Sequence, residues 1–343
     1  MRFILIMALS AFTFVLQALE IVIVGGGPSG LATAIEAHQT GANVTIVEKR
    51  NGYSRGQLLM LFNHSLELLK KWDVSIPSMR VANLDSDHLV GVSLIKDLEE
   101  ALAKRVHVLG ISVLKGEFID IGVATVTISE EGAQRKISYD ILVGADGVYS
   151  PVRNALAIPC NVVGSATAIG TLIPLPDPER QAELPAATFR DGLFVKRLFL
   201  PHGRFIVLQY PLTKSDKINK SLDKEALITA AQTAGWIEEA ECIASGKAVV
   251  RSEIPIVLQQ ANTFFNEEKS AILVGDAAAS APFCQALGAN TALRTAEIAG
   301  ELFAQLIKDK NHSYAQFNAE VKEATDAMVL DSAYLVEQGN DRE

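Results

Sequence analysis

The chain has 343 residues, enough for two domains that each bury a core. A hydrophobic fraction of 49% and a charged fraction of 21% are typical of a globular protein. The formal net charge of -9 leaves no basic excess to neutralise phosphates, which excludes nucleic acid as an expected partner. The three cysteines are too far apart for a disulfide framework, a zinc site or a redox pair, so we expect no metal.

The N-terminal residues 1–18 form an apolar segment behind Arg2. The segment resembles a secretory signal, with a cleavage position near Ala18, or a helix that lies on a membrane surface. It is shorter than the ~20 residues that a membrane-spanning helix needs.

A strand, a glycine turn and a helix follow directly. Residues 19–24 are a β-branched run, residues 25–30 read Gly-Gly-Gly-Pro-Ser-Gly, and residues 31–37 favour a helix. Gly41 is placed to end that helix, and residues 43–48 predict a second buried strand that ends on an acid. The unit is a βαβ motif.

The glycine turn has the spacing of a dinucleotide-binding site. Gly25, Gly27 and Gly30 let the chain turn sharply and let a pyrophosphate approach the backbone. The helix N-terminus, which includes Ser29, would face the phosphates, and Glu48 would accept hydrogen bonds from a ribose. Because a carboxylate disfavours a 2′-phosphate, the site predicts FAD or NAD rather than NADP.

The middle of the first half predicts mixed elements. Residues 92–103 predict a helix, and residues 106–108 and 111–114 predict short strands. Residues 123–128, followed by the Glu131-Gly132 turn, predict an antiparallel meander.

The second half begins with a buried strand over residues 139–144. Between about residues 160 and 268 the pattern changes to scattered strands and frequent prolines, which indicates a mainly β unit. Residues 269–276 predict another buried strand, and residues 291–308 predict a long helix.

Two later motifs carry a family resemblance. Residues 141–153, ILVGADGVYSPVR, resemble the DG fingerprint of the flavoprotein aromatic hydroxylases, the p-hydroxybenzoate hydroxylase class of the FAD-dependent monooxygenase superfamily (group A). Residues 271–278, AILVGDAA, resemble its GD fingerprint. Three fingerprints in this order are far more specific than the glycine turn alone.

The resemblance implies an α/β fold, with a Rossmann-like FAD-binding domain of the GR2 type and an inserted, mainly β substrate domain. We assign residues 19–160 and 268–343 to the FAD-binding domain and residues 161–267 to the substrate domain, with residues 1–18 as the apolar N-terminal segment.

The resemblance also implies roles for single residues. In the family the GD aspartate holds the ribityl chain of FAD, and a later Pro and Gly-x-Asn segment wraps the isoalloxazine. Matched position by position, these roles fall on Asp276, Pro282, Gly288 and Asn290. The DG aspartate and arginine, here Asp146 and Arg153, are linked to the handling of both FAD and NAD(P)H.

The stretch Glu48-Lys49-Arg50, with Tyr53-Ser54-Arg55, is similar to the actin-oxidising flavin monooxygenases, in which the arginine lies near the flavin. We therefore add Lys49, Arg55 and Lys96 as cationic FAD contacts, with a solvated surface cation as the alternative. The chain departs from the family at Ala279, where a His is common, at Ala286, where a Gly is expected, and at Thr295, near the place of an Asp.

The resemblance implies an FAD-dependent, NAD(P)H-using monooxygenase. Such an enzyme hydroxylates an aromatic or other electron-rich small substrate with O₂ through a flavin C4a-hydroperoxide. The flavin carries the chemistry, so no catalytic side chain is assigned. One alternative is an FAD-dependent reductase or dehydrogenase on the same fold. The other, motivated by Ala279 and Ala286, is a catalytically degenerate flavin-binding partner protein.

Because FAD and reduced nicotinamide are made in the cytoplasm, and no twin-arginine pair is present, we expect a cytoplasmic protein. Export or membrane association through residues 1–18 is the alternative. The substrate, the choice between NADH and NADPH and the oligomeric state stay open.

Overall fold

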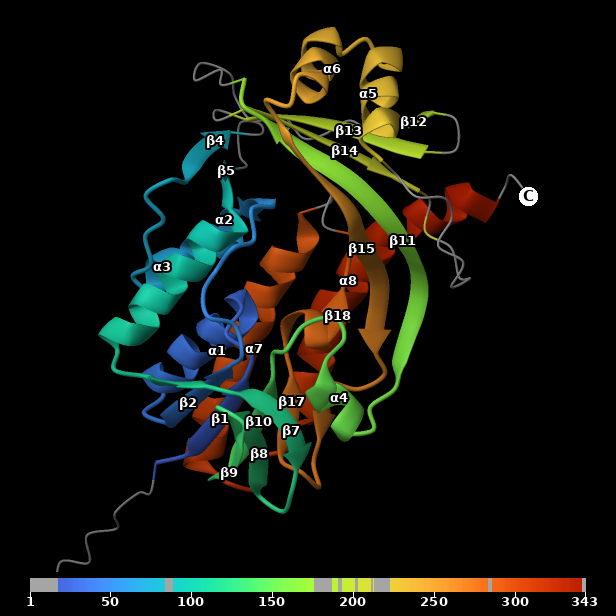
Figure 1. The fold of residues 1–343 in the computed structure, drawn as a ribbon. Coiled ribbons are helices and arrows are strands. Elements are labelled where there is room, and N and C mark those ends of the chain that lie inside the picture. The colour runs from blue at the N-terminus through green and yellow to red at the C-terminus, as the bar shows by residue number, and fades with distance from the viewer. Residues whose placement is uncertain are drawn as a thin grey trace, which may run out of the picture.

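The computed structural model describes residues 18–83, 89–175, 187–190, 193–200, 203–210, 212, 223–282 and 286–340. The expectation of a signal or surface helix over residues 1–18 therefore falls almost wholly outside the described residues. Figure 1 shows two main sheets with helices packed around them.

The first sheet has the strand order β16-β17-β10-β1-β2-β6. Its strands are β1 (Glu20–Val24), β2 (Asn43–Glu48), β6 (Ser112–Lys115), β10 (Ile141–Gly144), β16 (Phe265–Asn266) and β17 (Ala271–Leu273). All of them pair in parallel except the edge strand β16, which is antiparallel. The central strands are apolar and almost continuously buried because a parallel sheet is covered on both faces.

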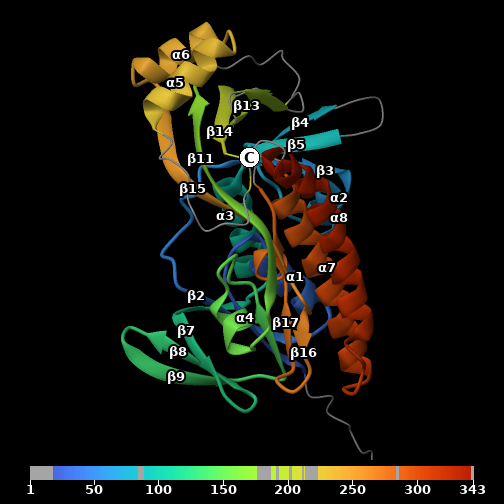
Figure 2. The ribbon, with the colours of Figure 1, turned by 90° about the vertical axis from the view of Figure 1, so that its right-hand side faces the viewer.

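Three helices cover one face of this sheet, and a smaller sheet covers the other (Figure 2). The helices are α1 (Pro28–Gln39), α7 (Leu287–Lys308) and α3 (Ile95–Val108), and α8 (Ala315–Asn340) packs behind α7. On the other face lie β7 (Glu117–Ile121), β8 (Thr125–Glu130), β9 (Ala133–Ser138) and the short helix α4 (Pro151–Ala155). The predicted meander is confirmed, with Glu131 and Gly132 both at positive φ in its turn.

The second sheet is antiparallel, with the order β12-β13-β14-β11-β15-β18. Its strands are β11 (Cys160–Ile173), β12 (Ala187–Arg190), β13 (Leu193–Leu200), β14 (Gly203–Gln209), β15 (Val249–Ala261) and β18 (Ala279–Ser280). The long strands β11 and β15 pair from Cys160 and Ala261 to Leu172 and Val249, and they carry the chain from the first sheet and back (Figure 1). The helices α5 (Lys224–Thr233) and α6 (Ile237–Ala244) cover its outer face.

Besides the meander, another three-stranded sheet, called the small sheet below, has the order β3-β5-β4 and was not predicted from the sequence. It is formed by β3 (Leu58–Phe62), β4 (Arg80–Asn83) and β5 (Leu89–Leu94), and α2 (Asn63–Lys71) follows β3. Met60, Val90 and Val92 pack against Leu172 and Phe205 of the second sheet. This small sheet therefore closes the space between the two larger ones.

Two predicted elements are wrong. The helix expected from Val92 begins only at Ile95, because Val92 belongs to β5 and pairs with Met60 and Arg80. The strand expected over residues 106–108 is the last turn of the same helix, whose buried face includes Val106. Val90 and Val92 alternate as in a strand, whereas Leu98, Leu102 and Val106 recur as on one face of a helix. The pairing of β5 with β3 and β4 decides where the strand ends and the helix begins.

The fold is α/β with a parallel, Rossmann-like core, as predicted. The domain boundaries stay a prediction, and several contacts cross them. Strand β16 lies before residue 268 but pairs with β17 of the first sheet. Strand β18 lies after residue 268 but pairs with β15 of the second sheet. Within the described residues, no helix is both long and apolar enough to cross a membrane.

Candidate cofactor-binding site

The glycine turn between β1 and α1 is closely packed. Gly25 has a φ of +110°, and a Cβ built on it would lie 2.3 Å from the carbonyl oxygen of Ala145. A Cβ on Gly30 would lie 1.9 Å from the carbonyl oxygen of Gly25. Neither position accepts a side chain, because the colliding atoms belong to the backbone. The glycines therefore let α1 begin directly against the strand ends.

The N-terminus of α1 is open to a ligand. Gly27 precedes the helix, no side chain caps it, and its first turn contains no acidic residue. Unpaired N–H groups and the positive end of the helix dipole make such a terminus an anion site. A pocket opens beside it, lined by the glycine turn, Glu48, Arg55, Asp146 and Phe118 of β7.

Glu48, at the end of β2, is held by four hydrogen bonds. Its Oε2 accepts from the backbone N–H of Gly26 (2.7 Å) and from the Arg50 guanidinium (2.9 Å). Its Oε1 accepts from the backbone N–H (2.7 Å) and the Nε (3.1 Å) of Arg50. Burial opposes ionisation, but the bonds and charge of Arg50 and the bond of Gly26 outweigh it and lower the pKa of Glu48. A ribose would have to share this carboxylate with Arg50 or displace it.

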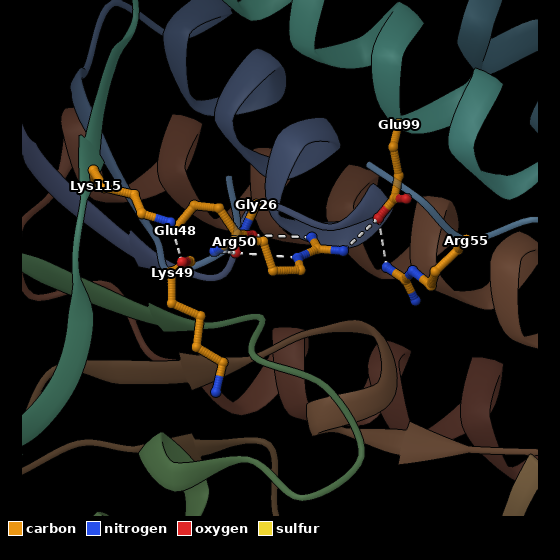
Figure 3. Close-up of polar contacts among 7 residues, drawn as sticks. All are labelled: Gly26, Glu48, Lys49, Arg50, Arg55, Glu99 and Lys115. Carbon is orange, nitrogen blue, oxygen red and sulfur yellow. Dashed lines mark hydrogen bonds and ion pairs between the residues drawn. The ribbon is translucent and has the colours of Figure 1, made fainter. Parts of the chain in front are cut away.

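A buried acid, Glu99 of α3, connects two arginines beside the glycine turn (Figure 3). Its side chain is fully buried, and its Oε1 accepts from Arg50 (3.1 Å) and from Arg55 (2.5 Å). The Arg55 guanidinium reaches the turn, since a Cβ on Gly27 would lie 3.3 Å from it. Among the described residues, nothing donates to Oε2 of Glu99. Glu99 thus holds two cations at the place where an anion would bind.

The two predicted lysines lie differently. Lys49 lines the same pocket and pairs with Glu117 at 3.2 Å, but both side chains are 64% exposed, so the pair contributes little. Lys96 donates its backbone N–H to the carbonyl of Arg55 at 3.0 Å, and its side chain is partly exposed. Lys96 therefore positions the Arg55 loop through its backbone, and a direct cofactor contact stays a prediction.

The DG turn is held together by its own residues. Asp146 accepts a short hydrogen bond from Ser150 and one of 2.9 Å from the N–H of Val152, at the start of α4. Burial raises the pKa of Asp146, and these bonds and the charge of Arg153 oppose that rise. Arg153 is only 5% exposed and donates to the carbonyls of Ala277 and Val148, both at 2.9 Å. It ties the DG turn to the GD turn, and its expected link to the handling of FAD and NAD(P)H stays a prediction.

The GD turn brings Asp276 to the edge of the sheet after β17. Gly275 has a φ of +58°, and a Cβ there would lie 2.5 Å from the Ser29 side chain. Ser29 is thus packed against the GD turn. No described residue donates a hydrogen bond to the carboxylate of Asp276; burial raises its pKa, and the charge of Arg55 opposes this. A partly exposed acid without donors can accept hydrogen bonds from ligand hydroxyls.

Asn290, near the start of α7, is already saturated. Its Oδ1 accepts from the N–H of Phe62 (2.9 Å) and from Ser65 (2.7 Å), and its Nδ2 donates to the carbonyls of Met60 (2.8 Å) and Ala286 (2.6 Å). It fastens α7 to the small sheet, and contact with a flavin ring is an untested prediction. Pro282 is buried and Gly288 faces Asp276, with 3.8 Å between a Cβ built there and Oδ1.

The sequence reasoning missed Glu99 and gave Arg50 no role. A buried acid on an otherwise apolar helix face, beside Leu98 and Leu102, is a signal that could have found it. Thr295, which stands near an expected acid, is fully buried and accepts from the N–H of Gly275 at 3.0 Å. Among the described residues, no group of three His, Cys, Asp or Glu could hold a metal.

Curated proteins match the chain over short segments. A stretch of 138 residues is 30% identical to [F-actin]-monooxygenase MICAL2 of Rattus norvegicus and covers 36% of this chain and 7% of that protein. A stretch of 169 residues is 26% identical to FAD-dependent monooxygenase OpS4 of Beauveria bassiana, with 41% and 40% covered. The matches thus span less than half of each relative.

Solved structures share the fold over nearly the whole chain. PqsL, a probable FAD-dependent monooxygenase from Pseudomonas aeruginosa, has a TM-score of 0.73 at 17% identity, with 95% of this chain and 98% of that chain covered. 2-Methyl-3-hydroxypyridine-5-carboxylic acid oxygenase has a TM-score of 0.69 at 17% identity, with 95% and 94% covered.

Two family models match the sequence. The model described as pyridine nucleotide-disulphide oxidoreductase matches residues 19–169, which include the glycine turn and the DG turn. The model described as FAD binding domain matches residues 120–330, more than half of the chain, which include the DG and GD turns. The chain therefore belongs to the FAD-binding domain family, and the relatives that it resembles over part of their length include FAD-dependent monooxygenases.

Proposed function

We propose that this protein uses NAD(P)H and O₂ to hydroxylate an aromatic or other electron-rich small molecule at a bound FAD. The observation that carries the proposal is the pocket at the N-terminus of α1, where the glycine turn, Glu48, Arg55 and the DG turn converge. Asp276 extends this set of groups along the strand ends, toward the second sheet.

Each of these groups is suited to one part of FAD, from the adenosine through the pyrophosphate to the ribityl chain. Glu48 would accept from the adenosine ribose, and the N-terminus of α1 with Arg55 would hold the pyrophosphate. Asp276, which has no donor among the described residues, would accept from the ribityl hydroxyls. The segment with Pro282 and Gly288 follows directly. Two observations support the fit of FAD. Only glycine permits the backbone of the turn at Gly25 and Gly30, and no described residue donates a hydrogen bond to Asp276, where the ribityl hydroxyls would lie.

FAD, when bound, supplies the electron transfer from NAD(P)H and the activation of O₂. The chain supplies binding, orientation and the exclusion of water. The small sheet and the second sheet pack together through Met60, Val92, Leu172 and Phe205, beside Ala286 of the segment expected at the isoalloxazine. An apolar surround of this kind supports chemistry that must be protected from water.

Two structural neighbours have been solved with a small-molecule ligand bound. PqsL has been solved in complex with 2-aminobenzoylacetate, and it matches with a TM-score of 0.74 at 17% identity. Aklavinone-11 hydroxylase has been solved with FAD and aklavinone, with a TM-score of 0.68 at 16% identity. Both support a small conjugated substrate for the present chain.

The test measures NAD(P)H oxidation by the FAD-loaded protein and the incorporation of oxygen from O₂ into a product. The protein is reconstituted with FAD, and NADH or NADPH oxidation is followed with a panel of phenols and aromatic acids. Products formed under ¹⁸O₂ are analysed by mass spectrometry. A product that carries one ¹⁸O atom supports the proposal. Substrate reduction or dehydrogenation without incorporated oxygen would instead favour a reductase, and FAD binding with no NAD(P)H oxidation would favour a non-catalytic flavoprotein.

A further inference from the structure

The loop between β2 and β3 carries both arginines of the cofactor site. Arg50 and Arg55 each donate to the buried Glu99 (Figure 3). Between the two arginines stand Asn51 and Gly52, the only Asn-Gly pair in the chain. A chemical change at this pair would therefore act on the segment that positions both cations.

Asn51 and Gly52 are both exposed and belong to no helix or strand. A Cβ built on Gly52 would meet nothing within 4 Å, so the space beside this residue is open. Among the residues that the structure describes, no hydrogen bond of either residue is found. The Asn51 side chain is thus free to rotate toward the nitrogen of Gly52, which no side chain of its own shields. Asparagine is a thermolabile residue type, and this arrangement leaves it unprotected.

We propose that Asn51 is a site of deamidation, promoted by Gly52, and that the modification weakens the binding of FAD by this loop. The nitrogen of Gly52 loses its proton and attacks Cγ of Asn51. A cyclic imide forms as the bond between Cγ and Nδ2 breaks and ammonia leaves. Water then opens the imide at either carbonyl, which gives aspartate or isoaspartate. No electron is transferred, and water is the only co-reactant.

Both products place a new carboxylate next to Arg50. The Arg50 guanidinium already donates to Glu48 and Glu99. It also lies 5.5 Å from the centre of the Tyr53 ring. The new carboxylate competes for this cation and adds negative charge beside the pocket, and isoaspartate also lengthens the main chain between Arg50 and Arg55. The effect on FAD rests on the proposed function, since it needs the pyrophosphate to lie in that pocket. Because residue 51 is exposed and its charge is screened, we expect FAD binding to weaken by about two- to fivefold.

The experiment ages the purified, FAD-free protein in a mildly alkaline buffer. Peptide mapping by mass spectrometry follows the loss of the Asn51 amide, and labelling by a protein isoaspartate methyltransferase detects the isoaspartate. The Kd for FAD is measured by quenching of flavin fluorescence on fresh and on aged protein. Asn311, which is also exposed but is followed by His312, is the internal control and should keep its amide.

Three substitutions separate deamidation from general ageing. Gly52→Ala hinders the attack, and Asn51→Gln requires a larger ring that forms more slowly, so both variants should keep their FAD affinity on ageing. Asn51→Asp should bind FAD more weakly than the parent even when fresh. The proposal is overturned if Asn51 keeps its amide as Asn311 does, if the aged parent and aged Asn51→Gln lose affinity alike, or if deamidated protein binds FAD as the fresh parent does. Fresh parent that binds no FAD would refute the cofactor site, and peptide mapping would still test the deamidation.

Discussion

Replacement of Arg55 by methionine should weaken FAD binding and destabilise the protein through two separable effects. Arg55 lies beside the N-terminus of α1 and is one of two cations on the fully buried Glu99. The variant loses a cation at the proposed pyrophosphate site. It also leaves Glu99 with Arg50 as its only partner among the described residues.

The two effects have different sizes. Loss of a charge-assisted hydrogen bond to a phosphate costs about 1.5–3 kcal/mol, or about 10- to 150-fold in Kd. Loss of one partner of a buried pair costs about 3–5 kcal/mol. Arg50 remains 3.1 Å from Glu99, and Arg55 is 40% exposed and partly screened, so we expect about 1–2 kcal/mol in the free energy of unfolding.

A second substitution separates the effects. Glu99→Gln added to Arg55→Met removes the buried charge that Arg50 alone would have to compensate, and should restore most of the lost stability, but not FAD affinity. Kd is measured by quenching of flavin fluorescence, and stability by urea unfolding of the apoprotein. Arg135→Met, which breaks a surface pair of 3.0 Å with Glu130, is the control and should change neither quantity appreciably. Parent-like FAD affinity in Arg55→Met, or recovery of that affinity in the double variant, would refute the reasoning.

Three further predictions follow from the turns. Gly30→Ala should lose FAD retention on gel filtration, because its Cβ would lie 1.9 Å from a backbone oxygen, whereas Gly52→Ala, with nothing within 4 Å, should retain it. Arg153→Met should lower the free energy of unfolding by about 2 kcal/mol, since the buried carbonyl of Ala277 loses its arginine donor and that of Val148 keeps only Gln259; an unchanged urea midpoint would contradict this. FAD affinity should fall as the pH drops through the raised pKa of Asp276, because ligand hydroxyls favour its ionised form, and Asp276→Asn should remove that step. The lowered pKa of Glu48 keeps it ionised there, so its stability contribution is present above pH 4.5 and lost only below it; a titration that loses both together would contradict the assignment.

Elements defined by local pattern were predictable from the sequence. The βαβ unit, the meander turn and the long helix α7 each depend on residues close together in the chain, such as Gly41 after α1 and Gly132 in the hairpin. The order of the three fingerprints identified the family for the same reason, because turns at the ends of parallel strands need glycine and acid at fixed spacings. The strand-to-helix boundary at Leu94 was not predictable, since β5 is defined by its pairing with β3 and β4.

The roles of individual polar groups were decided by tertiary contacts. Arg153 and Asn290 both stand in family fingerprints, yet Arg153 donates to a carbonyl 124 residues away and Asn290 receives a hydrogen bond from a residue 228 positions away. Glu99 is three residues beyond Lys96 on one helix, and only the packing of α3 against α1 turns the acid, rather than the lysine, toward the two arginines. Local spacing therefore determined which backbone could bind a dinucleotide. Long-range packing determined which side chains hold that backbone together and which, such as Asp276, remain available to a ligand, because hydrogen-bond saturation depends on partners that the local sequence does not contain.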